Sequence, residues 1–261
     1  MDVVIVPDAA AVAEHAAETI ADAVRSRPGA VLGVATGSSP LGTYAALAAR
    51  VRDGRLDLAG VSAFALDEYV GLDPSHPESY RSVIRRTVTD PLGLDPERVH
   101  VPDGAAADLE AACVDYERRI AEAGGVDLQL LGIGANGHIG FNEPTSSFAS
   151  RTRIKTLAPR TRADNARFFA SADEVPIHCV TQGLGTILDA RELLLVAQGE
   201  EKADAVAAMV EGPLAAMCPA SALQLHRRAT VVVDRAAASR LSLTAYYEYV
   251  QEHRPRAKVS A

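Results

Sequence analysis

Short apolar runs alternate with segments of helical periodicity along the whole chain of 261 residues. The runs are rich in leucine and β-branched residues and predict strands at 3–6, 31–35, 61–66, 99–101, 126–133, 177–180, 193–197 and 231–233. Between them, apolar residues recur at helical spacing, as in 9–25, and further helices are predicted at 79–88, 105–123 and 239–252. This alternation predicts an α/β fold with a doubly wound, mostly parallel sheet and helices on both faces, a modified Rossmann-like arrangement. Residues 1–261 show no long linker, composition break or repeat, so we expect a single domain.

The charge balance and the cysteine count exclude several classes of protein. Lysine and arginine number 26 against 34 acidic residues, a net charge of −8, which argues against nonspecific nucleic-acid binding. No apolar run reaches the roughly 18 residues of a membrane span, and the initial MDVVIV lacks the basic start of a secretory signal. The three cysteines form neither a CxxC nor a zinc pattern, which indicates free thiols in a reducing compartment. We therefore expect a cytoplasmic protein without a membrane segment.

A turn of small and hydroxyl residues joins the second predicted strand to a helix. Thr36, Gly37, Ser38 and Ser39 precede Pro40, and the helical segment follows at once. Unpaired N–H groups and the helix dipole at such a start attract anions, and the hydroxyls could add donors. An ordinary serine cap before proline explains the same pattern and is the commoner case. The turn alone leaves both interpretations open, but it is not a Walker loop, because it lacks GK[ST].

The stretch 130–144 reads LLGIGANGHIGFNEP and predicts a buried strand that ends in a polar turn. Ligands of open α/β sheets bind at this carboxyl end of the strands. His138 is the natural acid or base there, since its ordinary pKa of about 6.5 lies near working pH, although a lone histidine in a turn is more often structural. Glu143 is near enough in the turn to orient or charge the imidazole, and Asn136 could hold its tautomer or bind a substrate hydroxyl.

A second pair of polar residues follows the third predicted strand. Asp67 and Glu68 are adjacent in an extended segment, so their side chains point to opposite sides and one of them can face a cleft. Asp67 fits a general base at a strand end, and capping of the next turn explains it equally well. Two bases from different strands would suit a reaction with two separate proton transfers.

Basic residues gather in the polar segment 145–171, and a lysine opens a later helix. Lys202 lies in the first turn of the helix predicted at 200–210, where its charge opposes the helix dipole unless an anion lies between them. The basic segment is either a solvated surface or one or two anion sites, and its cations are Arg151, Arg153, Lys155, Arg160, Arg162 and Arg167. No G-x-S-x-G elbow is present, and GIGANG fits a dinucleotide fingerprint only loosely. Cofactor-free proton transfer on a phosphorylated small molecule is the chemistry that remains.

Several motifs in a fixed order resemble the glucosamine-6-phosphate deaminase (isomerase) family over nearly the whole chain. They are ATGSSP, LDEYVGL followed by HPESY, GIGANGHIGFNEP, SRTRIKTL, and the Lys202 helix with VEGP after it. Each motif alone is weak to moderate, and the ordered set is highly specific. The resemblance implies conversion of D-glucosamine 6-phosphate and water to D-fructose 6-phosphate and ammonia, with no metal or organic cofactor.

The resemblance also implies roles for single residues. Asp67 is similar to the base that moves a proton between C1 and C2. His138 resembles the acid and base of ring opening, assisted by Glu143 and by the residue at position 136, which is Asp or Asn in the family. Asn136 leaves this relay one carboxylate short, so the pH dependence is expected to differ. The implied phosphate cradle consists of Thr36, Gly37, Ser38, Ser39, Arg167 and Lys202.

Assembly and regulation vary among the proteins that these motifs resemble. Some are hexamers activated by N-acetylglucosamine 6-phosphate at a subunit interface, and others are monomers without that site. Similarity to the allosteric segment favours a homohexamer with this activator, although the initial MDVVIV lacks an early basic residue associated with that site. A monomer with a basic surface loop is the alternative. The residues that resemble the allosteric site are Ser146, Ser147, Arg153, Lys155 and Tyr247.

Two rival functions remain at the level of the sequence. A 6-phosphogluconolactonase would share the fold and the phosphate turn, but its pattern after the central strand resembles GxDGHxASLFP, whereas this chain has GHIGFNEP. A noncatalytic sugar-phosphate sensor would need no acid or base, yet Asp67, His138 and Glu143 are all in place. Such sensors accompany helix-turn-helix extensions, and the sequence shows none.

Overall fold

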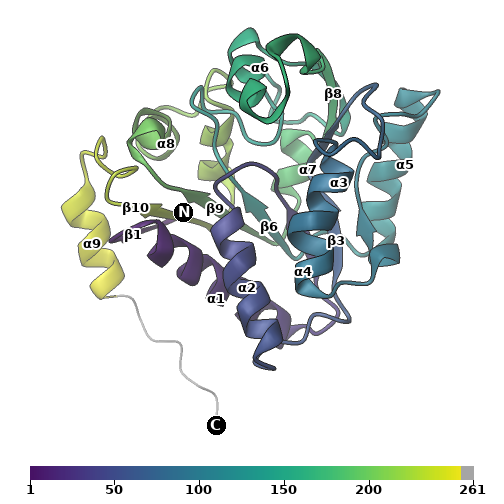
Figure 1. The fold of residues 1–261 in the computed structure, drawn as a ribbon. Coiled ribbons are helices and arrows are strands. Elements are labelled where there is room, and N and C mark those ends of the chain that lie inside the picture. Colours follow the sequence, from purple (N-terminus) through teal and green to yellow (C-terminus); the bar gives the residue numbers. More distant parts are fainter. Residues whose placement is uncertain (254–261) are drawn as a thin grey trace.

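A seven-stranded parallel sheet forms the centre of the computed structural model, which describes residues 1–253 (Figure 1). The strands lie in the order β1, β10, β9, β6, β2, β3, β5, and all neighbours run parallel. The predicted doubly wound parallel sheet is confirmed. Its strands are β1 (Asp2–Val6), β2 (Val31–Val34), β3 (Ser62–Ala65), β5 (Val99–His100), β6 (Leu128–Leu131), β9 (Glu192–Ala197) and β10 (Ala229–Asp234).

The central strands bury both of their faces, because successive side chains point to opposite sides of the sheet. In β1, Val3 and Ile5 belong to one core, whereas Val4 and Val6 belong to the other. Helices contribute to both cores, as predicted. The first core includes side chains of α5 (Leu109–Glu122), α7 (Leu184–Leu188) and α8 (Ala203–Val210). The second includes side chains of α1 (Ala9–Ser26), α2 (Leu41–Arg52), α3 (Tyr80–Ile84), η1 (Arg85–Thr89) and α4 (Asp90–Leu92).

Several predicted helices have different boundaries in the structure. The segment predicted at 79–88 is divided between α3 and the π-helical η1, and Gly93 in the left-handed conformation, at φ 63°, ends the α4 that follows. The helix predicted from 105 begins at Leu109, because the Asp108 carboxylate accepts a hydrogen bond from the Ala111 N–H and caps it. The last helix, α9 (Thr244–Glu252), begins later than the predicted position 239. Short 3-10 turns, η2 (Pro96–Arg98) and η6 (Pro219–Leu225), complete the connections.

A second, antiparallel sheet of three strands stands beside the central one, and the sequence did not predict it. Its order is β4 (Asp67–Tyr69), β8 (His178–Thr181), β7 (Arg153–Thr156). The run 177–180, predicted as part of one sheet, is β8 of this second sheet. A small core of its own lies here, formed by Tyr69, Phe141, Leu157, Val175 and Cys179. The polar segment 145–171 thus contains a strand as well as the helical pieces α6 (Pro159–Asn165) and η3 (Ala166–Phe168), and η4 (Ala172–Glu174) follows.

The winding of the central sheet reverses between β2 and β6. From β2 the chain proceeds outward through β3 and β5, and it then returns to β6 on the other side and continues to β9 and β10. Neighbouring carboxyl ends diverge at such a reversal, and ligands of doubly wound folds bind in the crevice there. The fold therefore places a binding crevice at the ends of β2 and β6.

Two simpler predictions can be compared with residues 1–253. Within that range, none of the helices combines the length and the apolar character needed to cross a bilayer. Cys113 and Cys179 are buried and Cys218 is half-buried, and all three are free thiols. The expectation of unpaired cysteines is confirmed.

Candidate active site

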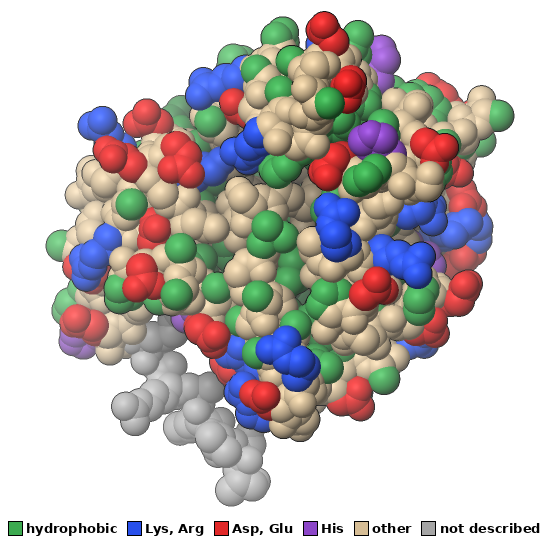
Figure 2. Space-filling model, viewed as in Figure 1, with side chains coloured by type: hydrophobic (Ala, Val, Ile, Leu, Met, Phe, Trp, Pro, Cys, Tyr) green, Lys and Arg blue, Asp and Glu red, His purple; other side chains and the backbone are tan. Residues whose placement is uncertain are grey.

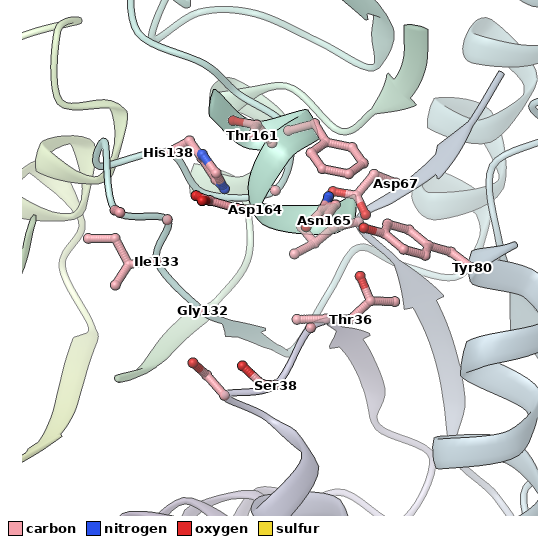
Figure 3. A pocket seen from close by; sticks show the side chains of 18 of the residues that line it. Thr36, Ser38, Asp67, Tyr80, Gly132, Ile133, His138, Thr161, Asp164 and Asn165 are labelled. Carbon is pink, nitrogen blue, oxygen red and sulfur yellow. The ribbon is translucent and has the colours of Figure 1, made fainter. Parts of the chain in front are cut away.

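A cavity opens at the carboxyl ends of β2, β3 and β6, at the reversal of the sheet. Figure 2 shows a hollow at this place, beneath the part of the chain that carries α6, with lysine and arginine side chains at its sides. Figure 3 shows the lining side chains converging from the strand ends below and from α6 above. Residues that the sequence placed in a site and that line this cavity are Thr36, Gly37, Ser38, Ser39, Asp67, His138, Arg167 and Lys202.

The hydroxyl turn after β2 forms one wall and leaves its donors available. Gly37 adopts φ 90°, a conformation that favours glycine and turns the chain sharply into α2. No side chain caps α2, whose N-cap position is Pro40. The serine-cap interpretation is therefore not supported, and the hydroxyls of Ser38 and Ser39 remain on the cavity wall beside the unpaired N–H groups of the helix start. Burial raises the pKa of the Tyr80 hydroxyl, and the Thr36 side chain opposes that rise.

Two cations reach the cavity from different elements. Lys202 is the last residue of the 3-10 turn η5 (Glu200–Lys202) and takes the N-cap position of α8, so the helix predicted from 200 begins as a 3-10 turn. Burial lowers the pKa of the Lys202 ammonium; the Glu201 and Asp164 carboxylates raise it, and Arg167 lowers it further. Arg167 is exposed in η3, with its guanidinium 4.8 Å from the ring centre of Phe168. Two cations that line one cavity together with a hydroxyl-rich helix start indicate an anion site.

The adjacent carboxylates Asp67 and Glu68 divide two roles between them. Glu68 is buried and accepts hydrogen bonds from the N–H groups of Tyr80 and Arg81, at 2.8 and 2.9 Å, so it supports the start of α3, whose N-cap residue is Ser79. Asp67 points the other way, lines the cavity and is 4% exposed. Burial raises the pKa of Asp67 to about 8, the nearby Glu68 charge adds to the rise, and the Phe141 N–H opposes it. The capping interpretation of Asp67 is therefore wrong, and its environment suits a base.

The turn after β6 assembles His138, Glu143 and Asn136 into one hydrogen-bonded unit. The Asn136 side-chain amide donates to Glu143 Oε2 at 2.8 Å, and its oxygen accepts a hydrogen bond from the backbone N–H of His138 at 3.2 Å. The Ala158 N–H donates to the other Glu143 oxygen at 3.1 Å. His138 Nδ1 lies 3.8 Å from Glu143 Oε2, too far for a direct hydrogen bond but close enough for charge stabilisation. Burial lowers the pKa of the imidazole, and Glu143 opposes that shift.

A glycine makes room for the imidazole in this turn. A Cβ atom at Gly134 would lie 2.2 Å from His138 Cε1, so the ring occupies the space that any larger residue would fill. The Gly134 N–H donates to the His138 carbonyl at 2.9 Å and closes the turn. The glycines of GIGANG therefore shape the histidine turn here.

Three residues of α6 and one of α3 also line the cavity, and sequence reasoning missed them. They are Thr161, Asp164, Asn165 and Tyr80. Spacing of three and four residues puts the first three on one face of a helix, which is the signal that the chain carried. It was overlooked because the polar segment 145–171 showed no apolar stripe. Asn165 Nδ2 also donates to the Tyr69 hydroxyl at 2.9 Å, which ties α6 to β4.

The five residues of the expected allosteric site are only partly assembled within the chain. Ser146 is buried, and its hydroxyl accepts a hydrogen bond from Arg153 NH2 at 3.2 Å. Lys155 shares β7 with Arg153, and Ser147 is exposed at the preceding turn. Tyr247 lies on α9, which contacts β1 at the opposite edge of the central sheet, where its hydroxyl donates to Glu211 at 3.2 Å (Figure 1).

Comparison with known proteins agrees with this geometry. Residues 8–233 match the family described as glucosamine-6-phosphate isomerases/6-phosphogluconolactonase. The chain is 62% identical to a glucosamine-6-phosphate deaminase of Streptomyces coelicolor over 98% of both chains, and 58% identical to one of Cutibacterium acnes over 97% of both.

Solved structures give the same result. A monomeric glucosamine-6-phosphate deaminase superposes with a TM-score of 0.90 at 43% identity, covering 92% of this chain and 100% of the other. The 6-phosphogluconolactonase of Trypanosoma cruzi superposes at 0.73 with 18% identity, covering 92% of this chain and 97% of the other, and shares the fold. The chain thus belongs to the family of glucosamine-6-phosphate isomerases and 6-phosphogluconolactonases, among its glucosamine-6-phosphate deaminases.

Proposed function

We propose that the chain is a hydrolase of amino-sugar and N-acetylglucosamine catabolism that converts D-glucosamine 6-phosphate and water to D-fructose 6-phosphate and ammonia. One observation carries this proposal: a buried carboxylate, Asp67, and a carboxylate-supported imidazole, His138, face one cavity whose wall also presents an anion site. Two acid-base groups beside an anion site suit a phosphorylated sugar that must undergo more than one proton transfer.

The phosphate is held first, at the hydroxyl turn and the two cations. Backbone N–H groups and hydroxyls of residues 36–39 donate to its oxygens, and Lys202 and Arg167 balance its charge. The sugar then extends towards Asp67 and His138. An anchored phosphate fixes the reacting carbons relative to both acid-base groups, which lowers the entropic part of the barrier.

Ring opening is the task of His138 and its relay. The imidazole accepts the proton of the O1 hydroxyl and returns a proton to O5 as the C1–O5 bond breaks and the C1 carbonyl forms. Glu143 stabilises the transient imidazolium across 3.8 Å, and the Asn136 amide holds that carboxylate in place. This relay resembles the third member of a triad, which orients and charges a histidine.

Asp67 carries out the isomerisation. Its carboxylate removes the proton from C2 of the open-chain sugar while the C2 ammonium gives a proton to O1, which forms an enolamine. The protonated Asp67 then delivers its proton to C1, and the nitrogen lone pair forms the iminium at C2. Water then adds to C2 and ammonia departs, giving the ketone. One carboxylate on one face of the substrate can perform both transfers, because C1 and C2 are adjacent.

The experiment that tests this function measures ammonia release from D-glucosamine 6-phosphate by the purified chain. Hydrolysis of 6-phosphogluconolactone, measured in parallel, is the direct test of the rival enzyme, since the lactonases share the fold at 17–21% identity. We expect ammonia and no lactone hydrolysis. Lactone hydrolysis without ammonia would establish the lactonase, and sugar-phosphate binding with neither reaction would establish the sensor.

We further propose a homohexamer activated by N-acetylglucosamine 6-phosphate, supported by the Ser146–Arg153 hydrogen bond and by Lys155 on the same strand. Tyr247 lies far from these residues within one chain, so a site that includes it needs a second copy. The relative described as monomeric, at 43% identity, is the counter-example. Elution at monomer mass, with a substrate curve unchanged by the activator, would contradict this assembly. The expected cytoplasmic location and single domain stay predictions.

A further inference from the structure

The helix α6 carries a carboxylate, Asp164, over the cavity. Asp164 lies on the same helical face as Thr161, and both line the cavity with Asn165. The hydrogen bond from Asn165 to the Tyr69 hydroxyl, 2.9 Å long, holds this face of the helix towards the strand ends. Figure 3 shows the Asp164 carboxylate beside the His138 imidazole, on the side of the cavity away from Ser38.

His138 is surrounded by charges from three separate elements. Glu143 belongs to its own turn, Lys202 comes from η5, and Asp164 comes from α6. Burial and the Lys202 ammonium both disfavour the charged imidazolium, whereas the two carboxylates favour it. His138 Nδ1 is buried and has no hydrogen-bond partner among the described residues, so the ring is stabilised through space. The balance of charge at this ring therefore depends on how many carboxylates face it.

The residue at position 136 decides how many carboxylates the turn itself places near the imidazole. An aspartate there would place a carboxylate directly against the Glu143 oxygen, but Asn136 provides a neutral amide that donates at 2.8 Å. The turn itself thus contributes a single negative charge, from Glu143. Asp164 is the second carboxylate that faces the imidazole, and it comes from a segment far away in the sequence.

We propose that Asp164 is a positioning residue that acts through His138, supplying from α6 the second negative charge that Asn136 does not provide. The inference rests on the proposed role of His138 in ring opening. When the imidazole takes the O1 proton, Glu143 and Asp164 share the stabilisation of its charge until the proton passes to O5.

The direct test is an NMR titration of the histidine Cε1 protons in the full chain, with the His138 signal assigned by its loss in His138→Gln. In Asp164→Asn the His138 titration midpoint should move to lower pH, because one favourable charge is lost while the burial and the Lys202 charge remain. Asp164→Glu, which keeps the charge, should restore the midpoint towards that of the parent. An unchanged midpoint in Asp164→Asn would overturn the proposal.

A matched control separates this effect from general changes of charge. Asp173→Asn removes an exposed carboxylate from η4, which does not line the cavity, and should leave the His138 midpoint where it is. An equal shift in this control would overturn the proposal, since it would assign the effect to net charge. The other histidine signals report whether each variant is folded.

Kinetic measurements of ammonia release show whether Asp164 changes the acidity of His138 or contacts the substrate. Asp164→Asn should lower kcat for ammonia release and move the pH profile in the same direction as the His138 midpoint. A raised KM with an unchanged pH profile would instead make Asp164 a substrate-binding residue and overturn the positioning role. The NMR titration needs no activity, so failure of the proposed reaction and failure of this inference can be told apart.

Discussion

Asp67 and His138 face the same cavity, and burial acts on them in opposite directions. It raises the pKa of the Asp67 carboxyl to about 8 and lowers the pKa of the His138 imidazole, so both groups are driven towards their neutral forms. The difference lies in their neighbours. Carboxylates of Glu143 and Asp164 oppose the shift at His138, whereas the like charge of Glu68 reinforces the shift at Asp67.

This difference indicates which of the two groups depends on the substrate for its charge state. His138 has its compensating charges built into the protein. The principal influences on the Asp67 carboxyl are burial, the Glu68 charge and the Phe141 N–H, and no cation is among them. Near neutral pH the carboxyl therefore holds its proton for much of the time. We expect the ammonium of the amino sugar to be the cation that converts Asp67 to a base. Removing each group in turn should therefore have unequal consequences.

The largest effect is expected for Asp67→Asn. An amide cannot move the proton between C2 and C1, and the loss of a general base costs about 10²- to 10⁴-fold in rate. Ammonia release at saturating substrate should fall by that factor while KM changes little. Full activity in this variant would remove Asp67 from the mechanism.

A smaller loss is expected for Glu143→Gln. The variant keeps the shape of the side chain and its contact with the Ala158 N–H but removes the charge that faces His138. Ring opening also proceeds slowly in solution, so kcat should fall less than in Asp67→Asn, by about tenfold to a hundredfold. A loss as deep as that of Asp67→Asn would show that the relay also serves the isomerisation.

Lys202→Ala tests the part of the site that lies outside this pair. A charge-assisted contact to the phosphate is worth about 1.5–3 kcal/mol, so KM for the sugar phosphate should rise at least about tenfold. The contact is the same in ground state and transition state, and kcat should change little. Saturation kinetics with an unchanged KM would argue against a phosphate contact.

The smallest effect concerns stability and its pH dependence. The pKa of Asp67 in the folded chain, about 8, lies above its ordinary value of 3.8, so the folded state loses stability as pH rises through this interval. The neutral amide of Asp67→Asn escapes that loss. Its melting temperature should exceed that of the parent by a margin that grows from about pH 4 to about pH 8 and then levels off. A margin independent of pH, measured by thermal melts, would contradict the raised pKa.

Much of the site was predictable because its residues follow predicted strands. Thr36, Asp67 and His138 each come shortly after an apolar run, and carboxyl ends of parallel strands meet at one edge of a sheet. Glu143 and Asn136 are close to His138 along the chain, so their contact followed from local spacing. The choice between base and cap for Asp67 needed the structure, because the sequence does not say which of two adjacent carboxylates faces the helix start.

The segment 145–171, which carries α6 over the cavity, was not predictable in the same way. β7 has charged residues at Arg153 and Lys155 and reads as a loop, and it forms a strand because β8 pairs with it. The cavity-facing side of α6 is polar, since it faces a ligand site instead of a core, and Asp164 therefore had no signal beyond its spacing.

The sequence by itself determined the alternation of strands and helices, the two-faced cores and the placement of polar residues at strand ends, because these follow from local periodicity and burial. Only the tertiary structure decided that Glu68 binds the first N–H groups of α3 and that β4 of a second sheet places Asp67 in the cavity wall. It also decided that Asp164 lies near His138, which belongs to a turn far away in the sequence. These outcomes depend on contacts between segments far apart in the chain, and no local pattern encodes which of them meet.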